Sequence, residues 1–332
     1  MMTIVVIAIV LALLFDFFNG MNDAANSIAT IVSTKVLSPL TAVLWAAMWN
    51  FSAAFFFGVH VATTVGKGIV EPHAVNEYLI LASLIASIVW VYACTHLGLP
   101  ISVSHALIGG LIGPALVKHG PSVLVMSGII KVSLFIVLSP LIGFFIAYFF
   151  MILTLLIVRK TAPLKVENIF RVLQLFSSAI FSLGHGSNDA QKTMGIISVL
   201  LFSTGLIGPE FYVPTWVIFA GYSAIALGTL TGGWKVIRTI GVGLTDLKPV
   251  HGFVAESAGA STLIFTALLG IPVSTTHTIT GAIIGVGITR SFGAVRWKLA
   301  KKIVWAWVLT IPSTLVFSAL VYLLLRLIIP GI

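Results

Sequence analysis

The stretch LGLPISVSH at residues 97–105 returns almost unchanged as LGIPVSTTH at residues 269–277. Each copy separates two apolar runs and carries a glycine, a proline and a cluster of hydroxyl groups. Proline removes a helix hydrogen bond and glycine weakens a helix, so each copy predicts a helix break followed by a new helix start. The sequence therefore predicts two hairpins, whose arms lie at 76–97 and 102–118 and at 252–270 and 274–289.

Each hairpin has two interpretations that the sequence leaves open. It is either a re-entrant loop or a pair of full membrane spans, and both return the chain to the side from which it came. The glycines that follow each break also match in register, since Gly109 pairs with Gly281 and Gly113 with Gly285.

A second repeated element lies upstream of each hairpin. Asn22-Asp23-Ala24 recurs as Asn188-Asp189-Ala190, and each copy has a glycine two residues before its asparagine. The two repeated elements recur at nearly the same spacing, which indicates an internal duplication. We predict a first repeat at 1–158, a cytoplasmic linker at 159–167 and a second repeat at 168–332.

The composition sets the class of protein. Of the 332 residues, 59% are hydrophobic and only 8% are charged, against about 25% charged in an ordinary soluble domain. A soluble chain of this size has too little polar surface for that much apolar material. These values predict an all-α polytopic membrane protein and exclude a soluble enzyme, a disordered chain and a disulfide scaffold. The single cysteine, Cys94, excludes an intrachain disulfide.

The remaining long apolar runs predict further spans, at 3–34, 40–66, 122–158, 168–204, 212–234 and 299–329. The net charge is +9, and the basic residues gather at the ends of runs, which indicates membrane topology and not nucleic-acid binding. With both termini outside, most basic residues fall in the cytoplasm, namely those near Lys35 and Arg171 and within 159–165, 235–248 and 290–302.

In this topology each half crosses the membrane an odd number of times, so the two repeats are inverted relative to each other. Inverted repeats with interrupted segments at matching positions are typical of secondary transporters, whose sites lie near the bilayer midplane.

The repeated aspartates are the strongest candidate site residues. Placing a carboxylate inside the membrane costs roughly several kcal/mol of free energy, so Asp23 and Asp189 are expected to be functional. Asn22, Asn188 and Asn26 add amide oxygens beside them. Carboxylate and amide oxygens suit a hard cation such as sodium, whereas a protonatable acid suits proton coupling. The alternative is a structural role, as a helix cap or an ion pair.

The hydroxyl groups after each break form a candidate anion site. A helix that begins there directs its free N–H groups and its positive dipole end toward the break. We expect an anion to contact the side chains of Ser102, Ser104, Ser274, Thr275 and Thr276. The alternative is plain helix N-capping, which is compatible with anion binding.

Further polar residues have less certain assignments. His105 and His277 recur as a pair and either contact the substrate, relay a proton or hold the hairpin turns together. Lys192 either pairs with Asp189 or touches an anion. Gln191 offers a further carbonyl oxygen for the site, and Glu256 is either a cation or proton site or a solvated residue.

These motifs resemble those of a known family. NGMNDAAN at 19–26 and GSNDA at 186–190 are similar to the duplicated signature of the inorganic phosphate transporter (PiT) family, and the two Pro-Ile/Val-Ser-x-Ser/Thr-His stretches resemble its hairpin tips. The resemblance covers nearly the whole chain. It implies two inverted repeats with re-entrant hairpins, and import of orthophosphate with sodium, with protons in some bacteria, or of sulfate in some bacterial relatives.

The sequence also departs from strict duplication. The first copy has Ala24-Ala25-Asn26 where the second has Ala190-Gln191-Lys192, so the two halves are not equivalent. The second hairpin tip also carries one more hydroxyl group than the first.

Together these features predict a plasma-membrane symporter, not an enzyme, that imports inorganic phosphate with sodium by alternating access. Its expected partners are phosphate, sodium ions and the lipid bilayer. We expect no nucleic acid and no cofactor beyond the coupling ions, and the sequence does not decide whether the protein forms a homodimer. The alternatives are a proton-coupled phosphate or sulfate permease of the same fold and, in another class, an anion channel or a scaffold.

Overall fold

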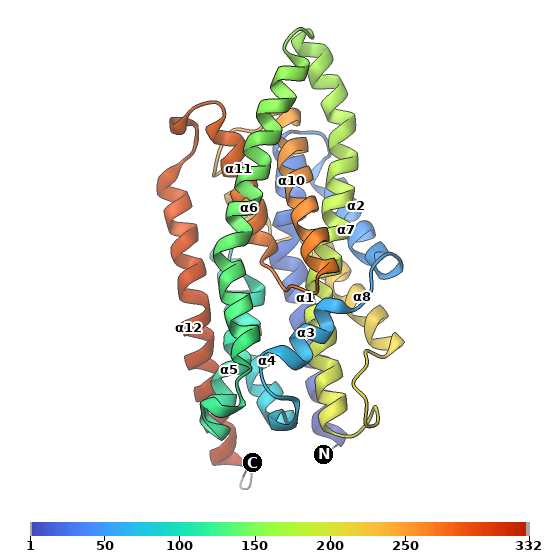
Figure 1. Ribbon diagram of the computed structural model, residues 1–332, viewed down its shortest axis with the longest axis vertical. Coiled ribbons are helices and arrows are strands. Elements are labelled where there is room, and N and C mark those ends of the chain that lie inside the picture. Colours follow the sequence, from blue (N-terminus) through green and yellow to red (C-terminus); the bar gives the residue numbers. More distant parts are fainter. Residues whose placement is uncertain (1, 330–332) are drawn as a thin grey trace.

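The computed structural model describes residues 2–329, and within this range the protein is built from α-helices joined by short turns (Figure 1). The predicted all-α fold is confirmed. The helices are α1 (Met2–Ser33), α2 (Pro39–Ser52), α3 (His60–Gly68), α4 (Glu77–His96), α5 (Val103–His119), α6 (Met126–Val158), α7 (Pro163–Ser203), α8 (Thr215–Thr231), α9 (Trp234–Gly241), α10 (Pro249–Leu268), α11 (Thr275–Ile288) and α12 (Trp297–Ile328).

The order of elements is the same in both halves of the chain. A long helix (α1 or α7) is followed by a bent pair (α2–α3 or α8–α9), a hairpin (α4–α5 or α10–α11) and a second long helix (α6 or α12). The start of α1 and the end of α12 lie at one end of the molecule and the α6–α7 connection lies at the other (Figure 1). α7 begins at Pro163, inside the stretch predicted as linker, so residues 159–162 alone connect it to α6.

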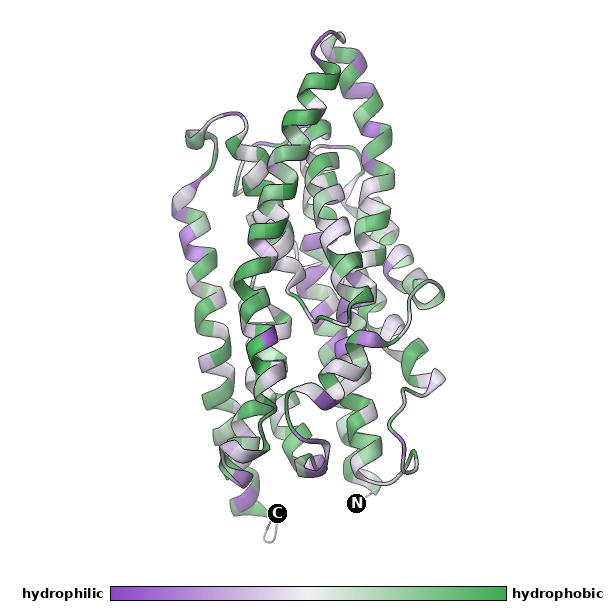
Figure 2. Ribbon diagram, in the orientation of Figure 1, coloured by the Kyte–Doolittle hydropathy of each residue, from purple (hydrophilic) through white to green (hydrophobic). Residues whose placement is uncertain are grey.

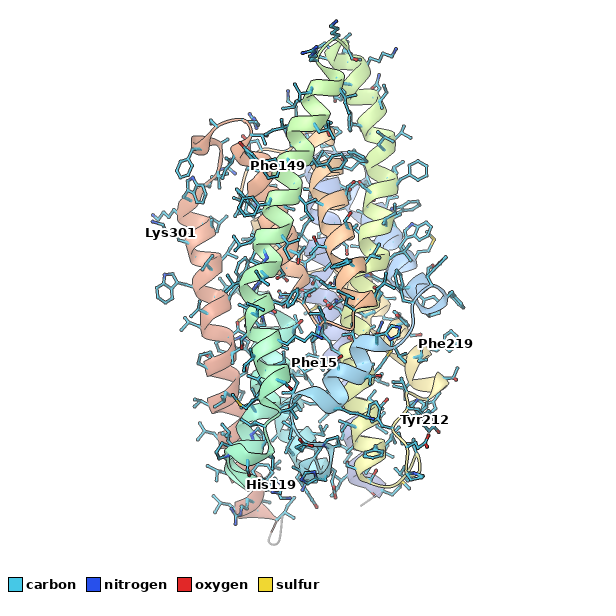
Figure 3. The ribbon with its side chains drawn as sticks, viewed as in Figure 1. Phe15, His119, Phe149, Tyr212, Phe219 and Lys301 are labelled. Carbon is cyan, nitrogen blue, oxygen red and sulfur yellow. The ribbon has the colours of Figure 1, made fainter. Side chains whose placement is uncertain are left out.

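The surface has the character of a membrane protein. Five of the described helices are long and apolar enough to cross a bilayer, and the count rises to seven if each bent pair forms one span. Hydrophobic residues cover most of the helices, and hydrophilic residues gather at the two ends and at mid-height (Figure 2). Phe149 on α6 and Phe219 on α8 are exposed on the outer surface, whereas Phe15 is buried (Figure 3).

Two runs that the sequence predicted as continuous are bent. The run at 40–66 divides into α2 and α3, which meet at 83°, and the run at 212–234 ends in α8, which meets α9 at 76°. The second bend follows from Gly232, which adopts a φ of 63° at the end of α8. Hydropathy did not reveal either bend, because it measures how apolar a segment is and not the direction of its helix axis.

The two halves are interleaved. α6 of the first half packs against α11 of the second, and α12 packs against α5. The matched glycines permit these close approaches, since a Cβ at Gly281 would collide with the carbonyl of Pro140 and a Cβ at Gly109 with that of Ile311. Small residues serve the same purpose at many helix–helix contacts in membranes. The repeats are thus not separate packing units.

The two hairpin turns have nearly the same geometry. Gly98 and Gly270 adopt φ values of 67° and 64°, which allow each first arm to end in a tight turn. The hairpins come from opposite ends of the molecule and their turns meet near mid-height (Figure 1), where Ser104 Oγ donates to the carbonyl of Val273 at 3.3 Å.

Candidate phosphate and cation site

The repeated aspartates meet at the start of α11. Asp23 extends from α1 and Asp189 from α7, and both are almost fully buried. Thr275 Oγ1 lies 3.2 Å from Asp23 Oδ2 and 3.1 Å from Asp189 Oδ2, and Thr276 Oγ1 lies 3.2 Å from Asp23 Oδ1. One hydroxyl proton serves only one acceptor at a time, so Thr275 bridges two carboxylates that it cannot satisfy together.

Lys192 lies beside Asp189 and connects the two hairpins. Its ammonium group pairs with Asp189 Oδ1, donates to Ser104 Oγ at 2.5 Å and donates to the carbonyl of Val273 at 3.0 Å. Of the two roles considered for Lys192, the ion pair with Asp189 is present. The contact with Ser104 also places the charge at the tip of the first hairpin.

His185 is a central residue that sequence reasoning did not select. Its Nε2 lies 3.3 Å from Asp189 Oδ2 and 3.9 Å from Asp23 Oδ2. On its other side, Nδ1 lies 3.1 Å from Asn50 Oδ1. Asn50 in turn donates to Thr229 Oγ1 at 3.0 Å. The available signal was its position one helical turn before the repeated aspartate, but the first copy carries Asn19 there, so the duplication did not mark it.

The asparagines of the two copies differ in how they are satisfied. Asn22 Nδ2 donates to Thr95 Oγ1 at 2.7 Å, and Asn26 Nδ2 lies 3.1 and 3.0 Å from the hydroxyls of Thr275 and Thr276. The Oδ1 atoms of both are buried and have no hydrogen-bond partner among the described residues. Asn188, by contrast, uses both ends of its amide on the second hairpin.

Asn188 Nδ2 donates to the carbonyl of Ile271 at 3.4 Å, and its Oδ1 accepts from the Val273 amide at 3.4 Å. The first cation candidate therefore has free carbonyl oxygens and the second does not. The structural asymmetry follows the sequence departure between Asn26 and Lys192.

The serines at the tips are helix caps. Ser102 Oγ accepts from the His105 amide and Ser274 Oγ from the His277 amide, each at 3.3 Å. Their hydroxyl protons stay available for a second partner. All five predicted hydroxyl residues are buried where the hairpin turns meet, at the N-termini of α5 and α11.

Comparison with known proteins shows the family of this chain. The sequence model of the phosphate transporter family matches residues 19–318. The chain belongs to the phosphate transporter family. A probable low-affinity inorganic phosphate transporter of Rhizobium meliloti is 55% identical over 95% of this chain and 94% of its own length. Another from Bacillus subtilis is 38% identical over 99% of both chains.

A solved structure described as the sodium-dependent phosphate transporter has the same fold. It superposes with a TM-score of 0.89 at 30% identity, over 98% of this chain and 100% of that one. The predicted family is thereby confirmed, as is the expectation of a transporter in place of an enzyme. Family membership and the long apolar helices make this phosphate transporter a multi-pass membrane protein.

Three further predicted residues of the phosphate transporter lie away from the aspartates. Gln191 Oε1 accepts from the amides of Val61 and Ala62, at 2.9 and 3.2 Å, and so caps the start of α3. His105 and His277 lie against each other with ring centroids 4.7 Å apart, and His277 stacks on Trp307 at 3.7 Å. For His105 and His277 these contacts correspond to the structural alternative, whereas Gln191 was predicted as a carbonyl oxygen of the cation site and contacts backbone amides of α3.

Glu256 forms a separate buried cluster between α10, α7 and α1. Its carboxylate accepts from Thr30 Oγ1 at 2.6 Å, from Gln174 Nε2 at 2.9 Å and from Ser177 Oγ at 2.5 Å. The side chain is fully buried, which removes the solvated alternative.

Proposed function

We propose that the protein imports inorganic phosphate together with sodium ions by alternating access. The observation that carries the proposal is the contact of both repeated aspartates with the hydroxyls of Thr275 and Thr276 at the start of α11. A cation site and an anion site therefore share atoms. The sodium dependence of the solved relative supports the choice of coupling ion.

The phosphate-binding site in this proposal lies between the two hairpin tips. Ser102, Ser104, Ser274, Thr275 and Thr276 supply hydroxyl donors, and the free N–H groups at the starts of α5 and α11 add the positive ends of two helix dipoles. Such a site binds an anion without an arginine. Lys192, already in contact with Ser104, adds one positive charge at its edge.

Positive charge in this proposal lies beside both Asp23 and Asp189, with Asn22, Asn188 and Asn26 as neighbours, and at least one of these charges is a bound sodium ion. Phosphate next to two carboxylates in a medium of low dielectric would be repelled strongly. A cation at the carboxylates removes the repulsion and frees the hydroxyls of Thr275 and Thr276 to turn toward phosphate. Each ligand then favours the other, which is coupling in the thermodynamic sense.

We propose that the chain lies in the plasma membrane as two inverted repeats with re-entrant hairpins, and that both termini lie on the outer side. Alternating access follows from this arrangement. The site at the meeting hairpin tips would open to either side as one set of elements moves against the other. The interleaving of α6 with α11 and of α12 with α5 links each hairpin to the opposite half, so the hairpins would move with those helices.

A proton is the second candidate for the coupling ion, and His185 favours it. An imidazole within 3.9 Å of both carboxylates can hold a proton that either aspartate shares. Glu256 is a further candidate cation or proton site, because three donors surround its carboxylate and no basic side chain of the described residues pairs with it.

Transport into proteoliposomes tests substrate and mechanism together. With the membrane voltage clamped to zero, radiolabelled phosphate should still accumulate against a trapped pool of unlabelled phosphate, since a carrier exchanges substrate and an anion channel without a voltage does not concentrate it. Excess unlabelled phosphate should compete and excess sulfate should not. If sulfate competes more strongly than phosphate, the protein is a sulfate permease. The pH dependence of the competition separates the two substrates, because phosphate changes charge near neutrality and sulfate does not.

A further inference from the structure

Within residues 2–329, Lys192 carries the one ammonium group that contacts the candidate site. We propose that this group is a built-in cation, which permanently occupies the second of the two cation positions generated by the duplication. The inference rests on the proposed function and specifies how many mobile cations it uses.

The two positions are equivalent in sequence. Aligning Asn22-Asp23 with Asn188-Asp189 places Asn26 against Lys192, each three residues after its aspartate. Residues three apart lie on the same face of a helix. The same place beside each aspartate is therefore filled by a neutral amide in α1 and by an ammonium group in α7.

The oxygen atoms around the Lys192 ammonium are of the kinds that bind sodium. Its Nζ contacts a carboxylate oxygen of Asp189, the hydroxyl of Ser104 at 2.5 Å and the backbone carbonyl of Val273 at 3.0 Å. Hard cations take the same three kinds of oxygen ligand. The side chain is 4% exposed, so water does not supply its hydrogen bonds.

The first position has the opposite character. The donors that contact Asp23 are the hydroxyls of Thr275 and Thr276, together with His185 at 3.9 Å. The Oδ1 atoms of Asn22 and Asn26 are buried without partners among the described residues. A buried acceptor without a partner is costly, and a cation that binds Asp23 would satisfy both amides. The first position thus suits a mobile cation, and the second supplies its own.

The consequence for transport is one mobile cation fewer per cycle than two equivalent positions would require. The ammonium group neutralises Asp189 in every state and returns with the empty carrier. It also holds the two hairpin tips together through Ser104 and Val273, so the second position contributes to closure without an ion.

The first test replaces Lys192 with the residue of the first copy. Lys192→Asn should acquire a steeper sodium dependence of phosphate uptake than the wild type, with activity restored at high sodium, because Asp189 then needs a mobile cation. The matched control is Lys301→Asn, which removes an exposed lysine from the outer face of α12 (Figure 3) and should behave as the wild type. An active Lys192→Asn with an unchanged sodium dependence, or an inactive one that sodium does not restore, would overturn the proposal.

The second test does not depend on the folding of Lys192→Asn. Radioactive sodium bound per chain is measured in the presence of phosphate for Asp23→Asn and Asp189→Asn. Asp23→Asn should lose one sodium ion, whereas Asp189→Asn should lose none, because its partner is Lys192. Loss from both variants would overturn the built-in cation. A wild type that binds no sodium would instead refute the sodium coupling, and the first test then asks whether Lys192→Asn gains a requirement for a cation that the wild type lacks.

Discussion

Thr275 Oγ1 lies 3.1 Å from Asp189 Oδ2, and the same hydroxyl lies within hydrogen-bond distance of Asp23. One side chain at the start of α11 thereby links the aspartates of both repeats. In the proposed function, this hydroxyl is the group through which a change at the carboxylates reaches the anion site.

Replacing this hydroxyl by a methyl group should weaken coupled binding. Thr275→Val keeps the shape of the side chain and removes a hydrogen bond to a charged group, a loss of about 1.5–3 kcal/mol, or roughly tenfold or more in affinity. The half-saturating concentrations of phosphate and of sodium should both rise in uptake assays. Thr278→Val is the control, because its hydroxyl bonds to the Ser274 carbonyl within its own helix. Equal effects of the two substitutions would remove the special role of Thr275.

His185 should set the response of transport to pH. His185→Asn installs the residue found at the matching place of the first repeat, Asn19, and removes the titratable ring from between the two carboxylates. Phosphate uptake by the variant should depend less on pH than uptake by the wild type, once the change in the charge of phosphate itself is allowed for. A pH profile that matches the wild type at lower overall rate would mean that His185 is only structural.

Gln191 should contribute to stability and not to ion binding. Gln191→Leu removes the oxygen that caps the first amides of α3, and loss of a cap costs about 1 kcal/mol. The melting temperature of the purified protein should fall, with the sodium affinity of the folded fraction unchanged. A lower sodium affinity at wild-type stability would instead assign Gln191 to the cation site.

The close contact between α6 and α11 predicts a sharp size limit at Gly281. Gly281→Ala would drive a methyl group into the Pro140 carbonyl, and overpacking of this kind costs about 1–3 kcal/mol. The control is Gly293→Ala, at a position where a Cβ meets nothing within 4 Å. Thermal unfolding of the two variants compares them directly, and equal stability would mean that the helices separate freely at this contact.

The sequence was sufficient for those parts of the fold that repeat or that composition dictates. The hairpins could be predicted because proline, glycine and hydroxyl residues recur together at 97–105 and 269–277. The bends between α2 and α3 and between α8 and α9 could not, because hydropathy records how apolar a segment is and not its direction.

For the candidate site, the duplication identified some residues and missed others. It marked Asp23 and Asp189, but it gave no weight to His185, which has no counterpart and still lies between them. The amides that donate to Gln191 and the Ser104 hydroxyl that Lys192 contacts lie outside α7, and such contacts depend on packing that one-dimensional spacing does not encode.

The central claim is that a cation at Asp23 drives phosphate import. The most direct measurement is the initial rate of radiolabelled phosphate uptake into proteoliposomes for the wild type and for Asp23→Asn, across a range of inward sodium gradients and with a proton gradient as comparison. The wild type should respond to sodium and Asp23→Asn should not accumulate phosphate at any sodium concentration. Normal uptake by Asp23→Asn with unchanged sodium affinity would contradict the account.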